Sequence, residues 1–444
     1  MLGRHGYSAL LYALSPLIWK RLKRERLPDS PAGERRGHIP DYHAQQTLWV
    51  HAASVGEVIT AAPVIRQMRA DYPSHTLVVT TMTATGAERV KSLFGNSVVH
   101  HFLPIDYPGA MKRFVRSLSP ELLVLAETEL WPNMLYAASE HNVPVVMINA
   151  RLSDKAFSRY ARFHQLTRDM LIRINWIAAK SGEDAKRFRS LGVPPKRISV
   201  AGALKFDLTV SDKQRDTGAA LRQQIGQRPV WIAASTHEGE EQAVLEAHRQ
   251  LLKVKPEALL LLVPRHPQRF DDVAKACGMA FPAAVARRSH DDAITTATRV
   301  YVGDTMGELI ALYAASDIAF VGGTLVPVGG HNLLEPAALG VPVLSGPHVN
   351  NLQEIADVMA AHQARREVND ALTLGHVLIE LFSNDQSRQR LGETGRQVVE
   401  RNKGASILIR DRIRAMVPVD EVVSGVVGEK VVGKKVVGKK VASA

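Results

Sequence analysis

The feature that most constrains the fold is a pattern that begins twice in the chain. TLWVHAASVGEVITAAPVIRQM (residues 47–68) predicts a buried strand, a turn of small residues and a helix, and PVWIAASTHEGEEQAVLEAHRQL (residues 229–251) has the same order. After each start, short apolar runs alternate with helical patterns, which is typical of a parallel sheet with helices on both faces. A chain of 444 residues is also too long for one ordinary domain. We therefore expect an α/β fold with two Rossmann-like, doubly wound domains that face a central cleft.

Shifts in composition indicate where these domains begin and end. We place the first domain at residues 31–206 and the second at residues 207–417, joined by a polar stretch near residues 207–228. The last helical segment, about residues 386–416, is a candidate to cross back onto the first domain. Residues 418–444 repeat VVGKK, and their regular Gly and Lys break any helical stripe, so this tail is predicted to be disordered.

Residues 1–30 combine an apolar segment with a basic cluster. YSALLYALSPLIW (residues 7–19) is followed by KRLKRER, and it is too short to span a bilayer as a helix, which needs about 20 residues. We predict an interfacial membrane anchor with Tyr7, Tyr12 and Trp19 at the level of the lipid headgroups. The alternative is a buried N-terminal helix.

The net charge of +12 also points to a membrane surface, because residues 1–26 carry six Lys and Arg against one Glu. A basic end beside an apolar segment fits anionic lipid. The sequence has no zinc finger and no RNA-recognition signature, so nucleic acid is not an expected partner.

The turn of the first start, HAASVGE, is the first candidate site. Ser54 can cap the following helix, and Glu57 lies at capping-box spacing from it. The turn also lies at the carboxyl end of a strand, where ligands of such sheets bind, and Gly56 leaves room for a substrate. At this point Glu57 has two open roles, a helix cap or a base that removes a proton.

A second candidate is the glycine-rich segment 322–351. Gly329 and Gly330 form turns before His331, and Asn332 can cap a helix that begins at the next residue. A loop of this kind offers free amides to a phosphate at the helix N-terminus. Glu335 lies at capping-box spacing or accepts hydrogen bonds from a ribose. The alternative is a purely structural loop.

Other polar groups of the second domain also follow predicted strands. Ser235 lies in the turn of the second start, and Arg265 follows ALLLLVP, where its guanidinium suits a phosphate or carboxylate. Met306 and Gly307 lie on a turn near the cleft. Glu308 follows a threonine that can cap a helix, and we assign it a structural role.

In the first domain, Glu127 and Glu129 follow the apolar run ELLVLA. Side chains alternate along an extended segment, so both carboxylates are predicted to face one side, where they suit acid–base work or sugar hydroxyls. Arg151 and Lys205 are cations near strand ends and suit an acidic substrate. The sequence contains no P-loop, nucleophile elbow, HExxH or Asp-x-Asp motif, and we expect no metal site.

Taken together, HAASVGE, AETELWPN, LKFD, STHEGEE, PRHPQRF, GDTMGEL and GGHNLLEPAALGVPVLSGPH resemble the motifs of the 3-deoxy-D-manno-octulosonic acid (Kdo) transferases of lipopolysaccharide biosynthesis. The resemblance runs from about residue 7 to residue 410. It implies a GT-B fold with an N-terminal acceptor domain and a C-terminal nucleotide-sugar domain, at the cytoplasmic face of the inner membrane. It further implies inverting, metal-independent transfer from CMP-Kdo, a substrate rather than a cofactor, to the lipid A precursor lipid IVA.

The resemblance also implies roles for the candidate residues. Glu57 is the implied general base, and Lys205 the implied partner of the donor carboxylate. The implied donor and nucleotide site comprises Ser235, Arg265, Met306, Gly307, Gly329, Gly330, His331, Asn332 and Glu335, and the acceptor-side candidates are Ser54, Gly56, Glu127, Glu129 and Arg151.

Two other functions are alternatives to Kdo transfer. Another GT-B enzyme, such as a nucleotide-sugar 2-epimerase, would need no lipid acceptor and no anchor. A non-catalytic membrane scaffold would bind the nucleotide sugar without transferring it.

Overall fold

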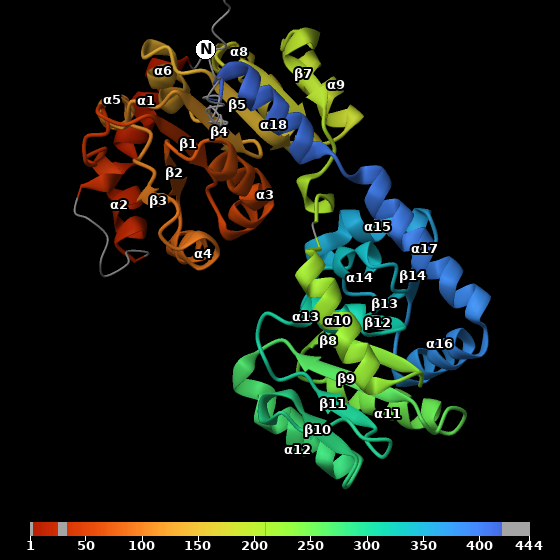
Figure 1. Cartoon of the computed structure of the whole chain (residues 1–444). Coiled ribbons are helices and arrows are strands. Elements are labelled where there is room, and N and C mark those ends of the chain that lie inside the picture. Colours follow the sequence, from red (N-terminus) through yellow and green to blue (C-terminus); the bar gives the residue numbers. More distant parts are fainter. Residues whose placement is uncertain (1–2, 25–32, 209, 420–444) are drawn as a thin grey trace, which may run out of the picture.

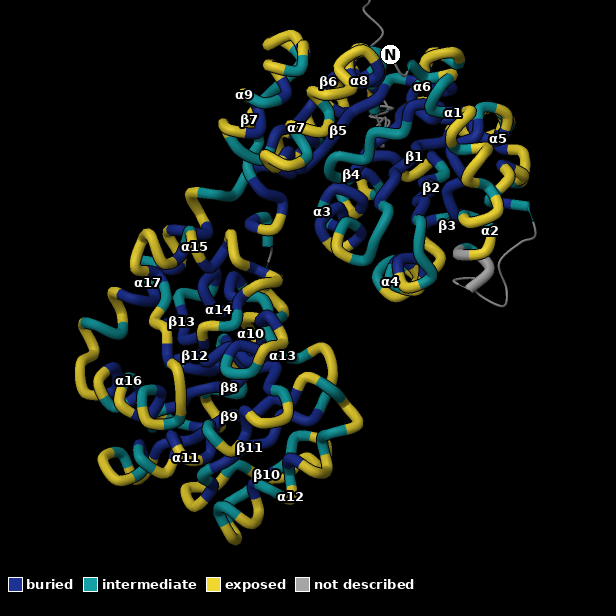
Figure 2. Tube along the Cα trace, turned by 180° about the vertical axis from the view of Figure 1, so that it is seen from behind, coloured by how far each residue is buried: buried dark blue, intermediate teal, exposed yellow. Residues whose placement is uncertain are grey.

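The computed structural model describes residues 3–24, 33–208 and 210–419. Two lobes follow one another along the chain, each built around a parallel sheet (Figure 1). Figure 2 shows buried residues along the strands at the centre of each lobe and exposed residues on the outer sides of the helices. The predicted pair of doubly wound parallel α/β sheets is therefore confirmed.

The first sheet has seven parallel strands in the order β3-β2-β1-β4-β5-β6-β7. Strands β1 and β4 are buried at every residue, as expected where helices cover both faces of a parallel sheet. The strands are β1 (Thr47–His51), β2 (Thr76–Thr81), β3 (Val99–Phe102), β4 (Leu122–Ala126), β5 (Val145–Ala150), β6 (Trp176–Ala179) and β7 (Ile198–Val200). The helices are α3 (Val55–Asp71), α4 (Ala84–Phe94), α5 (Pro108–Leu118), α6 (Pro132–Glu140), α7 (Asp154–Arg162), α8 (His164–Leu171) and α9 (Gly182–Ser190).

The second sheet repeats this arrangement in the order β10-β11-β9-β8-β12-β13-β14. Its first strand is again central. The strands are β8 (Val230–Thr236), β9 (Leu259–Pro264), β10 (Val285–Arg287), β11 (Val300–Val302), β12 (Ile318–Val321), β13 (Val343–Ser345) and β14 (Arg365–Glu367). The helices are α10 (Asp212–Ile225), α11 (Glu240–Leu252), α12 (Phe270–Ala280), α13 (Leu309–Ala314), α14 (Leu334–Ala338), α15 (Gln353–Ala361), α16 (Ala371–Ser383) and α17 (Asp385–Asn402).

Three strands of the structure do not follow from apolar runs in the sequence, namely β3, β10 and β14. All three lie at a sheet edge, and their sequences are VHHF, VAR and RRE. An edge strand needs less apolar surface than a central one, and charged residues there discourage pairing with another chain. These short sequences contain polar residues and therefore do not form the apolar runs that indicate a buried strand.

The chain passes between the two domains twice. The predicted polar joining stretch is mostly helix α10, whose N-cap Ser211 forms a capping box with Gln214. After α17, helix α18 (Ala405–Met416) returns to α3 of the first domain, where Asp71 accepts hydrogen bonds from Arg410 (2.7 Å) and Arg414 (2.6 and 2.9 Å).

The two crossings are joined by one carboxylate. Asp207, on the first crossing, accepts hydrogen bonds from the backbone amides of Gly404 (2.7 Å) and Ser406 on the second. These amides lie at the N-terminus of α18, so Asp207 caps the returning helix from elsewhere in the chain.

The N-terminal segment forms two helices, α1 (Arg4–Ala13) and α2 (Ser15–Arg24). Helix α1 is docked on the first domain, because Asn133 Oδ1 accepts hydrogen bonds from Arg4 (3.1 Å) and the buried Ser8 (3.3 Å). Within the described residues, no helix is both long and apolar enough to cross a membrane.

The predicted position of the aromatic rings at the lipid surface needs correction for Tyr7 and Trp19. Tyr7 and Trp19 are half-buried and pack against the first domain, and the ring of Tyr12 stacks on Tyr107 with centroids 4.6 Å apart. The side chains of Tyr7 and Trp19 pack on apolar residues of the first domain, whereas Tyr12 remains 53% exposed. The exposed leucines of this segment are Leu10 on α1, Leu14 between the two helices, and Leu17 on α2. Residues 420–444 of the predicted tail lie outside the described residues.

Candidate active site between the two domains

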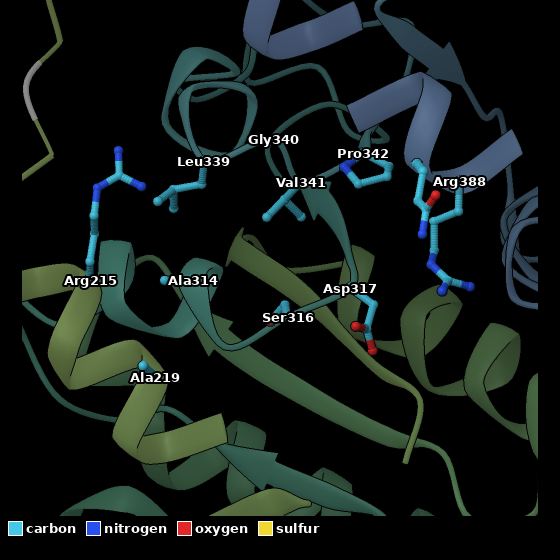
Figure 3. A pocket seen from close by; sticks show the side chains of 11 residues that line it. Arg215, Ala219, Ala314, Ser316, Asp317, Leu339, Gly340, Val341, Pro342 and Arg388 are labelled. Carbon is cyan, nitrogen blue, oxygen red and sulfur yellow. The ribbon is translucent and has the colours of Figure 1, made fainter. Parts of the chain in front are cut away.

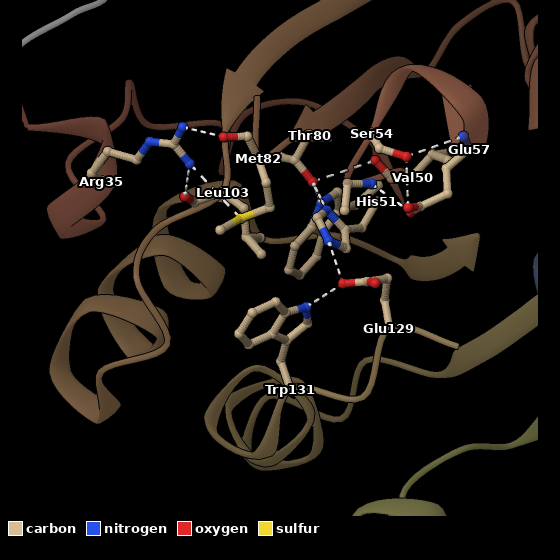
Figure 4. A network of polar contacts seen from close by, with 12 residues as sticks. Arg35, Val50, His51, Ser54, Glu57, Thr80, Met82, Leu103, Glu129 and Trp131 are labelled. Atoms are coloured by element: carbon tan, nitrogen blue, oxygen red, sulfur yellow. Dashed lines mark hydrogen bonds and ion pairs between the residues drawn. The ribbon is translucent and has the colours of Figure 1, made fainter. Parts of the chain in front are cut away.

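The turn after β1 places Glu57 in the first turn of α3 (Figure 4). Ser54 is the N-cap, and its hydroxyl accepts a hydrogen bond from the Glu57 amide (3.5 Å) and donates one to Glu57 Oε1 (2.9 Å). Glu57 Oε2 accepts a hydrogen bond from the amide of Ala53 at 2.7 Å. The capping interaction is therefore present, although the carboxylate reaches the amide of Ala53 rather than that of Ser54.

Burial raises the pKa of Glu57 to about 7, and the charges of Glu129 and Glu127 act in the same direction. The hydrogen bonds from Ala53 and Ser54 oppose this shift because they stabilise the ionised form. A carboxylate with a pKa near 7 can take up a proton at neutral pH and still be ionised in a large fraction of molecules. The capping contacts thus aim a group that is suited to act as a base.

Glu129 is held beside this turn by aromatic and imidazole groups (Figure 4). Trp131 Nε1 donates a hydrogen bond to Glu129 Oε2 (2.7 Å), and His51 Nε2 lies 3.8 Å from the same oxygen. The other ring nitrogen of His51 is 2.9 Å from Thr80 Oγ1. Glu129 is consequently fixed where its charge acts on Glu57.

The prediction that Glu127 and Glu129 face one side because of strand alternation rested on a wrong premise. Glu127 has φ +58°, so the segment is not extended there. A non-glycine residue in this region costs of order 1–3 kcal/mol and is frequent at functional sites. Glu127 lines a cleft between the domains, whereas Glu129 contacts Trp131 and His51.

This interdomain cleft has a volume of about 170 Å³ and brings together several candidate residues. Glu127 and Arg151 line it from the first domain, and Lys205 lines it from the segment in which the chain first leaves that domain. Asn351 lines it from the second domain. Lys180 also lines the cleft, and its ammonium pairs with Glu354 of α15. The remaining lining residues are Asn149, Ala203, Phe206, Asn350, Leu352, Gln353 and Ile355.

Asn351 connects this cleft to the glycine-rich loop. Its amide donates to the carbonyl of Gly329 (3.0 Å), and its side chain donates to the carbonyl of Val328 (3.0 Å). Gly329 has φ +102°, and a Cβ there would lie 2.5 Å from Asn351 Nδ2. The loop can therefore approach the cleft only with glycine at this position.

The expectation of free amides in the glycine-rich segment was wrong for its first part. The fully buried Glu240 accepts hydrogen bonds from the amides of Gly323 (2.7 Å), Thr324 (3.0 Å) and Leu325 (2.9 Å). The amide of Gly330 donates to the carbonyl of Gly323. A carboxylate of the protein therefore occupies donors that were assigned to a phosphate.

The helix after this loop also differs from the expectation. Helix α14 begins at Leu334 and has only five residues, so its dipole is small. Asn332 Oδ1 accepts a hydrogen bond from the Leu334 amide (3.1 Å), and its Nδ2 donates to Glu335 Oε1 (3.1 Å). Burial raises the pKa of Glu335.

Two histidines form a pair at the edge of the loop. The Nε2 atoms of His237 and His331 are 2.8 Å apart, so one ring donates and the other accepts. Burial lowers the pKa of His331 to about 4, and it lowers that of His237 as well. The exposed Arg265 lies near enough to act electrostatically on both rings, and it supplies positive charge on this side.

The remaining donor-side candidates lie on turns after β8 and β11. Ser235 is nearly buried with φ +58°, and its carbonyl packs against Gly322. Met306 is 63% exposed, and Gly307 has φ +88°. The predicted threonine cap is wrong, because α13 begins only at Leu309.

Glu308 has the structural role assigned to it. It accepts hydrogen bonds from Arg288 Nε (3.1 Å) and Nη2 (2.9 Å), and from the hydroxyl of Thr305. The ion pair lowers the pKa of this carboxyl.

A second hollow, of about 450 Å³, lies at the other end of the second sheet (Figure 3). It is bordered by Arg215 and Arg388 and floored by the segments that precede β12 and β13, including Asp317 and Val341. Ligands of open α/β sheets bind at the carboxyl ends of the strands, and this hollow is at the amino ends.

Sequence reasoning missed three residues, namely Lys180, His237 and Glu240. Lys180 had a usable signal, because a lysine directly after the apolar run WIAA resembles the positions of Arg151 and Lys205. His237 and Glu240 lie in the quoted THEGEE motif, yet their partners are more than 80 residues away.

Comparison with solved structures supports the arrangement of the domains. The UDP-GlcNAc 2-epimerase from Neisseria meningitidis, bound to UDP-GlcNAc, superposes with a TM-score of 0.54 at 16% sequence identity, covering 83% of this chain and 100% of that chain. At this identity the likeness concerns the fold alone, which is the GT-B-like pairing of two Rossmann-like domains.

Sequence comparison identifies the family. Residues 31–208 match the profile described as 3-deoxy-D-manno-octulosonic-acid transferase (kdotransferase). The chain is 43% identical over 371 residues to the 3-deoxy-D-manno-octulosonic acid transferase of Haemophilus influenzae, covering 83% of this chain and 87% of that protein. It is 35% identical over 438 residues to the transferase of Bordetella pertussis, covering 91% and 97%. The chain therefore belongs to the 3-deoxy-D-manno-octulosonic acid transferases, a family of glycosyltransferases.

Proposed function

We propose that this enzyme transfers Kdo from CMP-Kdo to a hydroxyl group of lipid IVA, with inversion and without a metal ion, and that Glu57 is the general base. The observation that carries the proposal is the geometry of Glu57. The pKa of this carboxylate is raised to about 7, and hydrogen bonds from Ser54 and Ala53 orient it. It also interacts electrostatically with Glu127, which lines the interdomain cleft.

In the proposed reaction, the acceptor hydroxyl gives its proton to Glu57 while its oxygen forms a bond to the anomeric carbon of Kdo. The bond from that carbon to the phosphate oxygen breaks, and its electron pair leaves with CMP. A base in this position contributes about 10²–10⁴-fold to the rate. Because attack and departure occur on opposite faces of the carbon, the configuration inverts.

The second domain is proposed to bind the nucleotide. Arg265, with His331 nearby, is placed to meet the phosphate, and Glu335 and Asn332 to meet the ribose. Ser235, Met306, Gly307, Gly329 and Gly330 shape the rest of this site. A monophosphate leaving group carries less charge than a diphosphate, so a guanidinium can stabilise it in place of a metal.

The first domain is proposed to bind the acceptor and the sugar. Ser54, Gly56, Glu127 and Glu129 surround Glu57, while Arg151 and Lys205 supply positive charge for the carboxylate of Kdo. Helices α1 and α2 are proposed to lie on the cytoplasmic face of the inner membrane, because Leu10, Leu14 and Leu17 are exposed next to a basic cluster.

The test combines purified enzyme with lipid IVA and with CMP-Kdo formed in place by an activating synthetase from cytidine triphosphate and Kdo. Mass spectrometry of the lipid should show one or more added Kdo residues, and a chelator added after the donor has formed should leave the rate unchanged. An unchanged lipid mass would contradict the function, whether the protein is an epimerase or a non-catalytic scaffold.

A further inference from the structure

An internal ion pair crosses the candidate active site. Lys180 directly follows β6, and its amide donates to the carbonyl of Ala150 (2.9 Å), which fixes the backbone at the carboxyl edge of the first sheet. Its ammonium binds the carboxylate of Glu354, in the first turn of α15 in the second domain. Two protein carboxylates, Glu127 and Glu354, therefore lie in a cleft that also holds three cations, and Glu354 is the one paired with Lys180.

The three cations of this cleft are not equivalent. Lys180 is nearly buried, with 9% of its side chain exposed, whereas Arg151 and Lys205 are exposed. Within the described part of the chain, neither Arg151 nor Lys205 forms an ion pair. Lys180 is thus the most desolvated cation of the cleft, and a desolvated charge discriminates most strongly between ligands with and without a carboxylate.

We propose that Lys180 is a specificity-determining residue for the carboxylate of the donor sugar, and that Glu354 holds its place until the donor binds. The inference rests on the proposed function, because it takes a Kdo-type donor as the ligand. On binding, one carboxylate replaces another on the ammonium of Lys180. No proton or covalent bond changes, and the side chain of Glu354 moves into solvent.

The exchange is energetically accessible because the two partners differ in burial. Glu354 is 49% exposed, so its departure gives up a weak, partly solvated ion pair. The freed carboxylate remains in the first turn of α15, where the helix amino end favours negative charge. Since the pair connects the two domains, donor binding also removes a contact between them.

The experiment compares two ligands that differ in the carboxylate. The KM for CMP-Kdo and the inhibition constant of CMP, which lacks the sugar, are measured for each variant. Lys180→Met should raise the KM for CMP-Kdo roughly 10- to 100-fold and leave the inhibition constant of CMP within about twofold. Glu354→Gln should lower the KM about two- to fivefold, since it removes a competitor. Lys186→Met, on the exposed face of α9, is the matched control and should change neither constant.

The charge-swapped variant, Lys180→Glu with Glu354→Lys, separates donor recognition from a simple bridge between domains. We expect it to stay defective, because Glu at position 180 repels the donor carboxylate. Recovery of the parental KM in the swap, or an equal loss of CMP and CMP-Kdo affinity in Lys180→Met, would overturn the proposal. Absence of transfer by the parent enzyme would instead reject the proposed function itself.

Discussion

Replacing Glu57 by Gln removes the proposed base while keeping the shape of the side chain. The amide oxygen can still accept the hydrogen bond from Ala53, so the start of α3 should remain intact. Loss of a general base costs about 10²–10⁴-fold in rate, which corresponds to about 3–5 kcal/mol of transition-state stabilisation. We expect kcat to fall by this factor above the pKa of Glu57, where the parent carries an ionised base, with the affinity for CMP unchanged.

The pH dependence of the parent enzyme follows from the same residue. With a pKa of about 7, roughly a tenth of the molecules carry an ionised Glu57 at pH 6 and roughly nine tenths at pH 8. A base must be ionised to accept a proton, so kcat/KM should rise with pH and level off above the pKa.

Glu129→Gln tests the electrostatic part of this argument. Its carboxylate raises the pKa of Glu57, and the neutral amide can still accept the hydrogen bond from Trp131. The rise of kcat/KM with pH, which we call the rising limb, should therefore occur at lower pH in this variant. Glu140→Gln, an exposed residue at the end of α6, is the control and should leave the limb in place.

The assay is the initial rate of Kdo transfer between pH 5.5 and pH 9, a range of about two units around that pKa. More than a tenth of parental activity in Glu57→Gln, or an unmoved limb in Glu129→Gln, would refute the reasoning.

Three further perturbations test other parts of the structure. Ion pairs with α18 lower the pKa of Asp71 from 3.8 to about 2, so Asp71→Asn should reduce the unfolding free energy by about 1–2 kcal/mol after allowance for the exposed guanidiniums. Because this pKa is depressed, the difference should be full above pH 4 and disappear as the pH falls toward 2, as measured by denaturant titration. Glu240→Gln should lower the Tm and weaken CMP binding measured by calorimetry, since an amide nitrogen would face backbone N–H donors at a cost of about 1–3 kcal/mol. Leu14→Glu with Leu17→Glu should reduce binding to anionic vesicles at least tenfold in a sedimentation assay, with transfer to detergent-dispersed acceptor retained.

The central strands of both sheets were predictable because burial on two faces requires continuous apolar runs such as LLVLA and LLLLV. The cap formed by Ser54 was predictable for a similar reason, since its partner is only three residues away. Both features depend on neighbours in sequence, and sequence patterns report such neighbours directly.

The rest of the site depends on contacts between distant segments. Glu240 is bound to amides 83–85 residues away, and Lys180 to a carboxylate 174 residues away. The local pattern does not distinguish Glu240 from a solvated surface charge, and the position of Lys180 after the run WIAA does not reveal its partner. The turn at Glu127 escaped prediction too, because its positive φ is imposed by the surrounding packing rather than by a glycine.

The return of α18 to the first domain has a consequence for biosynthesis. Ile409 and Ile413 complete the apolar cluster beneath α3, yet Asp71 and its partner Arg410 are 339 residues apart. At typical translation rates of about 5–20 residues per second, the ribosome needs on the order of tens of seconds to make the intervening chain. The first domain leaves the ribosome first but completes its fold only when α18 has been made. Until then the apolar surface of α3 is exposed to chaperones and to incorrect contacts with other chains.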